Sequence, residues 1–226
     1  MAENNNSQDL NSIDDLNNRL TNAGQKVADN KKIIYWALGI IVVIAVFIGS
    51  YFWIYRNPGL NNSWAAYNQV ELTANGNDTI RAREYAKVAD KYSHFDAGNV
   101  AALAAAEAYY NIGKYQEAVK YLDKFDTSDD VLLAQAKMLL GDSYVNLKKY
   151  DEAISAYNTC IRKAGGNPQI VPVALYKEAN VYDEQKKYQN ALDCYTRIQT
   201  EFPTFQFGNG MSVEAYIARE QARLGK

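Results

Sequence analysis

Hydrophobic positions follow two different patterns along the chain. Residues 33–55 form one apolar run without a charged side chain. After residue 60, apolar and small residues recur every three or four positions, which is typical of helices that bury one face. Short segments of Gly, Pro and Asn separate these stretches. The pattern predicts an all-α fold with one long apolar helix near the N-terminus and several amphipathic helices after it.

The apolar run 33–55 is long enough, as a helix, to cross a hydrocarbon core of about 30 Å. Aromatic side chains gather at both of its ends, as they do where rings settle among lipid headgroups. A cleaved signal peptide is the less favoured interpretation, because its apolar region is about 7–15 residues long and ends at small residues. The sequence predicts a single transmembrane helix over residues 33–55. The aromatic residues near its two ends are Tyr35, Trp36, Tyr51, Phe52, Trp53 and Tyr55.

Basic residues before and after this helix predict its orientation. Arg19, Lys26, Lys31 and Lys32 precede it, whereas Arg56 alone follows closely. Because basic flanks stay in the cytoplasm, residues 1–32 should be a cytoplasmic tail and the rest of the chain should lie on the far side. The tail begins with an Asn-rich stretch and is expected to be largely disordered. Apolar positions between residues 10 and 27 leave a short amphipathic helix open.

A repeated motif organises the remainder of the chain. The segments 113–125, 148–160 and 186–198 align without gaps on Tyr115, Tyr150 and Tyr188, with spacings of 35 and 38 residues. Each tyrosine is followed three positions later by an alanine. A second aligned set, Ala106/Gly141/Ala179 with Tyr109/Tyr144/Tyr182, lies upstream. A period of this length indicates stacked pairs of helices.

These residues resemble the tetratricopeptide repeat, in which small residues let two antiparallel helices cross closely and aromatic side chains wedge between units. The small-residue places are taken by the two sets above together with Ala118, Ala153 and Ala191. The resemblance implies an α-solenoid with three repeats over 99–203. A degenerate first helix pair, with Asp78 as the cap of its second helix, is expected over 61–97, and a capping helix over 212–224.

In that family the first helix of each pair lines a concave groove, so the resemblance also implies a set of ligand-facing positions. They combine apolar and acidic side chains, and they lack the basic clamp of chaperone-tail receptors except for Lys177 nearby. We therefore expect protein partners with apolar, mildly basic segments, while use of the convex face or an edge remains the alternative. The positions are Val100, Leu103, Glu107 and Tyr110 in the first repeat, Met138, Asp142 and Val145 in the second, and Val173, Tyr176, Asn180 and Asp183 in the third.

Composition narrows the chemistry further. A net charge of −2 gives no cationic field for nucleic acid. Cys160 and Cys194 have no zinc-ligand spacing, and the single histidine, His94, has no catalytic or metal-binding partners in sequence. No nucleophile–base pair is visible. The sequence predicts a protein that is not an enzyme and has no metal, cofactor or small-molecule substrate.

The full layout resembles a bacterial family that includes the ancillary subunit of the Sec translocon. The resemblance implies an inner-membrane protein with periplasmic repeats that hold client proteins at the translocon exit, together with periplasmic chaperones. Two alternatives stay open. One is a static scaffold in an envelope assembly for export, division or the cell surface. The other is an organellar import receptor with cytosolic repeats, which conflicts with the basic flank.

Overall fold

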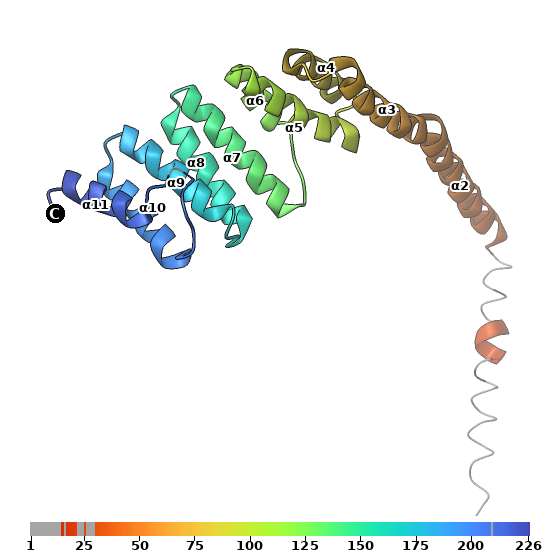
Figure 1. The fold of residues 1–226 in the computed structure, drawn as a ribbon. Coiled ribbons are helices and arrows are strands. Elements are labelled where there is room, and N and C mark those ends of the chain that lie inside the picture. The colour runs from red at the N-terminus through yellow and green to blue at the C-terminus, as the bar shows by residue number, and fades with distance from the viewer. Residues whose placement is uncertain (1–14, 16, 22–24, 26–29, 209) are drawn as a thin grey trace, which may run out of the picture. The chain divides into compact units, whose positions relative to one another are not determined.

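The computed structural model describes residues 15, 17–21, 25, 30–208 and 210–226. The predicted tail, residues 1–32, therefore lies for the most part outside the described residues. The chain divides after Pro58 into two units, residues 1–58 and 59–226, and each is taken by itself. Figure 1 labels the helices in chain order.

The first unit contains helix α2 (Lys31–Ser50) and the π-helix η1 (Tyr51–Arg56). Its large apolar side chains are exposed, with Phe47 at 76% and Ile41 at 60%. In the part of the chain that the structure describes, one helical stretch is long and apolar enough to cross a membrane, and its apolar window is unburied. The first unit therefore presents its apolar surface outward.

Residues 56–60, between the predicted apolar helix and the predicted first helix pair, are helical in the structure. Helical residues run on from η1 into α3 (Asn57–Ala74), although Pro58 is the second residue of α3. A proline ring inside an α-helix collides with the carbonyl four residues earlier. The turn before Pro58 is a π turn, in which the Asn57 N–H donates to the carbonyl of Phe52, five residues back. This wider turn lets the helix pass the proline.

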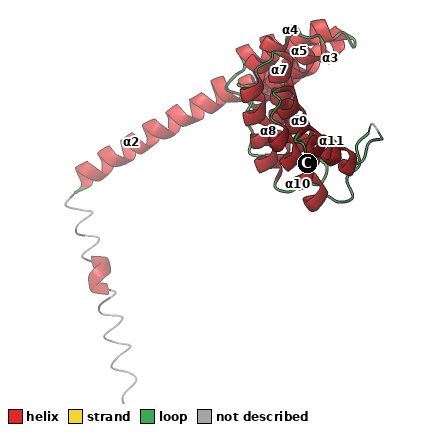
Figure 2. Cartoon of the chain, turned by 90° about the vertical axis from the view of Figure 1, so that its left-hand side faces the viewer, coloured by secondary structure: helices red, strands yellow, loops and turns green. Residues whose placement is uncertain are grey.

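The second unit is a row of helices in which each helix from α4 onward packs against the next along the chain. Figure 2 shows them joined by loops, the longest of which leads into α11, and the described residues contain no strand. Side chains join α3 to α4, where the Tyr67 and Tyr85 rings lie 5.0 Å apart. The further helices are α4 (Asp78–Lys91), α5 (Asp96–Asn111), α6 (Tyr115–Leu122), α7 (Asp130–Asn146), α8 (Tyr150–Ala164), α9 (Val171–Glu184), α10 (Tyr188–Glu201) and α11 (Val213–Arg223).

The same tight turn connects the two helices of each repeat. Gly113, Lys148 and Lys186 occupy equivalent places and all have a left-handed backbone, with φ of 74°, 58° and 59°. The next amide donates back to the first helix, as in Lys149 N to Tyr144 O at 2.9 Å. This is the Schellman arrangement, which ends one helix and reverses the chain. Two of the three turns therefore place a lysine where glycine is preferred.

Polar caps begin several helices. The sequence places Asp78 as the cap of α4, but the cap is Asn77, whose side chain accepts from the amides of Thr79 and Ile80. Asn77 has an extended backbone, which suits an N-cap, whereas Asp78 is already helical. Asp129 caps α7 and Ser212 caps α11 in the same way.

Small residues hold the helix pairs together. The repeat alanines Ala106, Ala118, Ala153, Ala179 and Ala191 are fully buried. Their small side chains leave room for large ones from the opposite helix, and Tyr157 and Tyr195 are at most 1% exposed. The small and large residues that recur in the sequence are therefore the places where the two helices of a pair cross.

Candidate partner-binding site

The predicted groove residues all lie on α5, α7 and α9, the first helices of the three repeats. A hollow of about 410 Å³ brings five of them together: Tyr110, Asp142, Val145, Asn180 and Asp183. The first, the middle and the last repeat each contribute to it. The other lining residues include Asn146 and Glu184, which the repeat pattern also places on the groove side, whereas Tyr150, Tyr157, Lys177 and Val181 were not predicted as groove residues.

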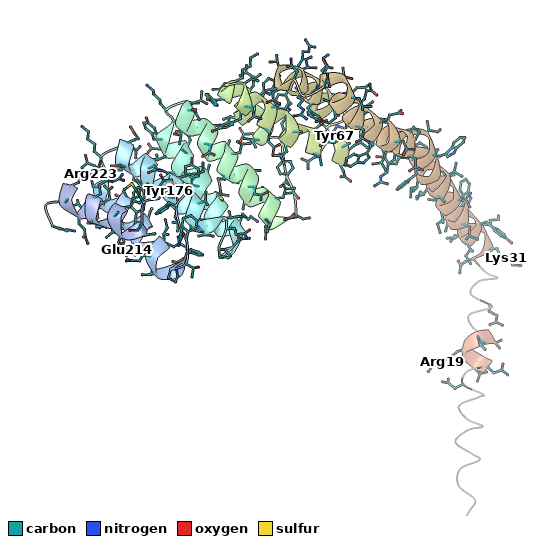
Figure 3. All side chains as sticks on the ribbon, in the orientation of Figure 1. Arg19, Lys31, Tyr67, Tyr176, Glu214 and Arg223 are labelled. Atoms are coloured by element: carbon teal, nitrogen blue, oxygen red, sulfur yellow. The ribbon has the colours of Figure 1, made fainter. Side chains whose placement is uncertain are left out.

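The other predicted residues do not line this hollow. Tyr176 belongs to an aromatic cluster near the C-terminal end of the solenoid, where its ring centroid lies 4.7 Å from that of Phe207 and its hydroxyl lies 3.2 Å from that of Tyr216. Figure 3 labels Tyr176 in this region. Met138 and Leu103 are partly buried against the hydrophobic cores. Val100 and Val173 are partly buried as well. These side chains therefore use much of their surface for packing within the domain.

Asp142 is held by two internal partners. The Tyr157 hydroxyl donates to its Oδ1 at 2.6 Å, and Lys177 Nζ lies 2.9 Å from both carboxylate oxygens. The Asp142 side chain is 18% exposed. Burial and the neighbouring Asp142 charge raise the pKa of the Tyr157 phenol, which therefore stays a hydrogen-bond donor. The hollow thus contains a neutralised ion pair at a place where the sequence indicated a free acid.

Asp183 is also paired within the chain. Arg219 Nη2 lies 3.3 Å from its Oδ2, and Arg223 contacts its other oxygen. Both arginines come from α11, and they also hold Glu220, which is fully buried, with Arg219 Nε 2.7 Å from Glu220 Oε1. This cluster fastens α11 to α9. The acidic character expected of the groove is largely cancelled here.

Glu107 differs from both aspartates. It is exposed and makes no hydrogen bond or ion pair with any residue that the structure describes. The surrounding protein nevertheless desolvates its carboxyl and raises its pKa. Glu107 is one helical turn from Tyr110, which lines the hollow.

The arrangement favours binding over chemistry. No group of three or more His, Cys, Asp or Glu side chains suited to a metal ion occurs among the described residues. Burial raises the pKa of the Cys160 and Cys194 thiols to about 12, so neither is a thiolate near neutral pH. The hollow offers tyrosine rings, valines, amides, paired charges and the exposed carboxylate of Glu184. Such surfaces bind other chains by packing and hydrogen bonding.

Comparisons with known proteins agree with this description. Residues 138–204 match the model of the tetratricopeptide repeat, and residues 78–160 match that of subunit 3 of the anaphase-promoting complex, or cyclosome. The helices of the second unit therefore form a tetratricopeptide-type solenoid, and such repeats imply a protein–protein interaction module. The class of the protein follows from the fold and the repeats, while the partner does not.

Solved structures show the same fold. A crystal structure of MamA protein is 20% identical, covering 73% of this chain and 84% of its own, with a TM-score of 0.59. Another structure of MamA is 22% identical over 68% and 82% of the two chains, with a TM-score of 0.54. At such identities the likeness concerns the fold alone. A sequence comparison with curated proteins found no match.

Proposed function

We propose that this chain is a membrane-anchored module that holds segments of other proteins in the hollow on α5, α7 and α9. The observation that carries the proposal is the hollow itself, in which Tyr110, Val145 and Tyr150 lie beside hydrogen-bonding groups from three successive repeats. Rings and branched aliphatic side chains give packing area, and the amides of Asn146 and Asn180 give polar contacts. This arrangement suits a partner segment that lies across all three repeats.

The anchor in this proposal is α2 with η1. Its side chains are exposed and apolar, which suits contact with lipid, and the basic residues Lys31 and Lys32 stand at its start. We propose a single pass through the bacterial inner membrane with the N-terminus in the cytoplasm and the solenoid in the periplasm. There the module would hold clients at the Sec translocon exit with periplasmic chaperones, or serve as a fixed scaffold in an envelope assembly.

Site-specific photo-crosslinking in living cells tests the hollow. A photoreactive side chain replaces Tyr110, Val145 or Glu184, and matched controls place it at Gln116 on α6 and Ser155 on α8, which are exposed on second helices. Adducts from the hollow positions and none from the controls are expected. Adducts confined to the controls would refute groove binding. Many different partners favour transient holding, and one dominant partner favours a fixed scaffold.

Topology reporters fused after Lys226 test the membrane arrangement. A reporter enzyme that is active only in the periplasm should be active in this fusion. A reporter enzyme that is active only in the cytoplasm should show no activity. The reverse result would instead place the repeats in the cytosol, as in an organellar import receptor. Loss of membrane association on deletion of residues 33–55 would establish the anchor.

A further inference from the structure

Glu107, Asp142 and Asn180 occupy the same place in the three repeats. The second helix of the middle repeat sends the Tyr157 hydroxyl to Asp142, 15 residues earlier, at 2.6 Å. In the last repeat the Tyr195 hydroxyl donates to Asn180, again 15 residues earlier, at 3.1 Å. At both places the hydroxyl of a buried tyrosine is therefore hydrogen-bonded to a polar side chain on the first helix of the repeat.

The first repeat breaks this pattern. The residue with the same offset from Glu107 is Leu122, which is 2% exposed and packs in the core around α5 and α6. Leucine has no hydroxyl, so Glu107 receives no such bond. Lys177 pairs with Asp142, and Arg219 with Arg223 pairs with Asp183. Of Glu107, Asp142 and Asp183, Glu107 is the residue whose carboxylate keeps its full capacity to accept hydrogen bonds.

Glu107 does not itself line the hollow, but it is close to a residue that does. It lies one turn before Tyr110 on α5, so a segment packed on Tyr110 and Val145 reaches Glu107 as it leaves the hollow. Glu184, which is exposed and lines the hollow, is on α9. A cationic side chain beside Glu107 would gain a charge-assisted hydrogen bond without displacing an internal partner.

We propose that Glu107 is a specificity-determining residue of the groove, and that it selects protein segments in which a Lys or Arg side chain flanks the apolar residues bound in the hollow. This inference rests on the proposed function. It assigns the preference for basic segments to one carboxylate rather than to a general acidic surface. The occupant is a peptide segment with an apolar centre and one cationic side chain near one end.

Peptide pools provide the test, with the full chain held in detergent micelles. The probes are fluorescein-labelled dodecapeptides with random Leu, Phe, Ala and Ser at the central positions and one fixed terminal residue, either Lys or its uncharged analogue norleucine. The wild-type chain is expected to bind the Lys pool about three- to tenfold more tightly than the norleucine pool. Glu107→Gln should remove this difference and leave the affinity for the norleucine pool unchanged.

Two further variants sharpen the result. Glu117→Gln removes an exposed carboxylate from α6, away from the hollow, and should keep the Lys preference. Leu122→Tyr should supply the missing hydroxyl and reduce the preference, provided that circular dichroism shows an intact solenoid. If that variant does not fold, Glu107→Gln still decides the matter.

The outcomes separate the inference from the function on which it rests. Binding of both pools with no Lys preference, or a preference that survives Glu107→Gln, overturns the role of Glu107 and leaves groove binding intact. Failure of every pool to bind the wild-type chain counts against the proposed function and removes the inference with it.

Discussion

The ring of Tyr157 lies directly over the backbone of Gly141. A Cβ atom added to Gly141 would come within 2.4 Å of Tyr157 Cε1 and 2.6 Å of Cδ1. The two residues are the crossing point of α7 and α8, and the same contact directs the Tyr157 hydroxyl to Asp142 in the hollow. The glycine therefore sets both the packing of the middle repeat and the polar floor of the candidate site.

Gly141→Ala should destabilise the solenoid by about 1–3 kcal/mol, because overpacking forces the buried ring to move. The measurement is urea unfolding of the detergent-solubilised chain followed by circular dichroism. Gly208→Ala is the control, since an added Cβ there meets nothing within 4 Å. In a Tyr157→Leu background, which copies Leu122 of the first repeat, the alanine should cost much less. An equal cost in both backgrounds would show that the ring is not the obstacle.

Glycine substitution at the repeat turns should stabilise the chain. Lys148 has φ of 58°, and a left-handed backbone costs a residue with a side chain about 1–2 kcal/mol. Glycine loses roughly 0.5–1 kcal/mol in chain entropy, so Lys148→Gly should gain a net 0.5–1 kcal/mol or so. The urea midpoint measures it. Lys149→Gly, where φ is −92°, is the matched control and should give no gain. A loss of stability at residue 148 would contradict the prediction.

Whether a contact can be predicted from the sequence depends on how far apart its two residues are along the chain. The small and aromatic residues of Tyr115–Ala118 and its copies report contacts inside one helix pair, so the period alone predicts the solenoid. The Lys177–Asp142 and Arg223–Asp183 contacts join residues 35 and 40 positions apart. Such pairs depend on how successive repeats stack, which no local pattern fixes. The groove therefore appears acidic in the sequence and is largely neutralised in the structure.

The helical turn before Pro58 is a local feature that the sequence does not predict. An Asn-Pro-Gly sequence ordinarily indicates a break, because proline removes a donor and glycine lowers helix propensity. The π turn of η1 moves the last hydrogen bond before the proline to the carbonyl five residues back. The aromatic residues there give no sign of this wider turn in the sequence.

Both cysteines should resist alkylation in the folded chain. Cys160 is fully buried and Cys194 is 8% exposed, and burial raises the pKa of each thiol to about 12. At pH 8 iodoacetamide should therefore label neither thiol until guanidinium unfolds the solenoid, as judged by intact-mass spectrometry. Ser155→Cys, an exposed position on α8, should label at once in the folded chain and serves as the positive control. Rapid labelling of the native wild type would mean that the helix pairs open readily.

Glu178 should make stability depend on pH. It is 4% exposed, its Oε1 accepts from Asn158 Nδ2 at 2.9 Å, and desolvation raises its pKa despite that bond, the Tyr182 hydroxyl and nearby Arg197. The folded chain holds this proton more tightly than the unfolded chain. Its contribution to stability is thus greatest at acid pH and is lost as pH rises through the raised pKa.

Glu178→Gln keeps the acceptor oxygen and removes the buried charge. It should unfold at higher urea than wild type at pH 7, with a gap that shrinks as pH falls toward the ordinary glutamate range. Glu152→Gln, an exposed residue of α8, controls for the change in net charge. A gap that widens on acidification would have the wrong sign for a desolvated carboxyl.

Lys177 should limit how strongly the hollow attracts cations. Its Nζ lies 2.9 Å from both oxygens of Asp142, so Lys177→Met would leave that carboxylate bonded only to Tyr157. The freed charge faces the same hollow as Tyr110, and the affinity for the Lys-terminated peptide pool should rise roughly threefold. Lys163→Met breaks a comparable 2.9 Å pair, with Asp130, outside the hollow and should change nothing. If both variants raise the affinity equally, net charge rather than the Asp142 site explains the effect. If Lys177→Met leaves it unchanged, bound segments do not reach Asp142.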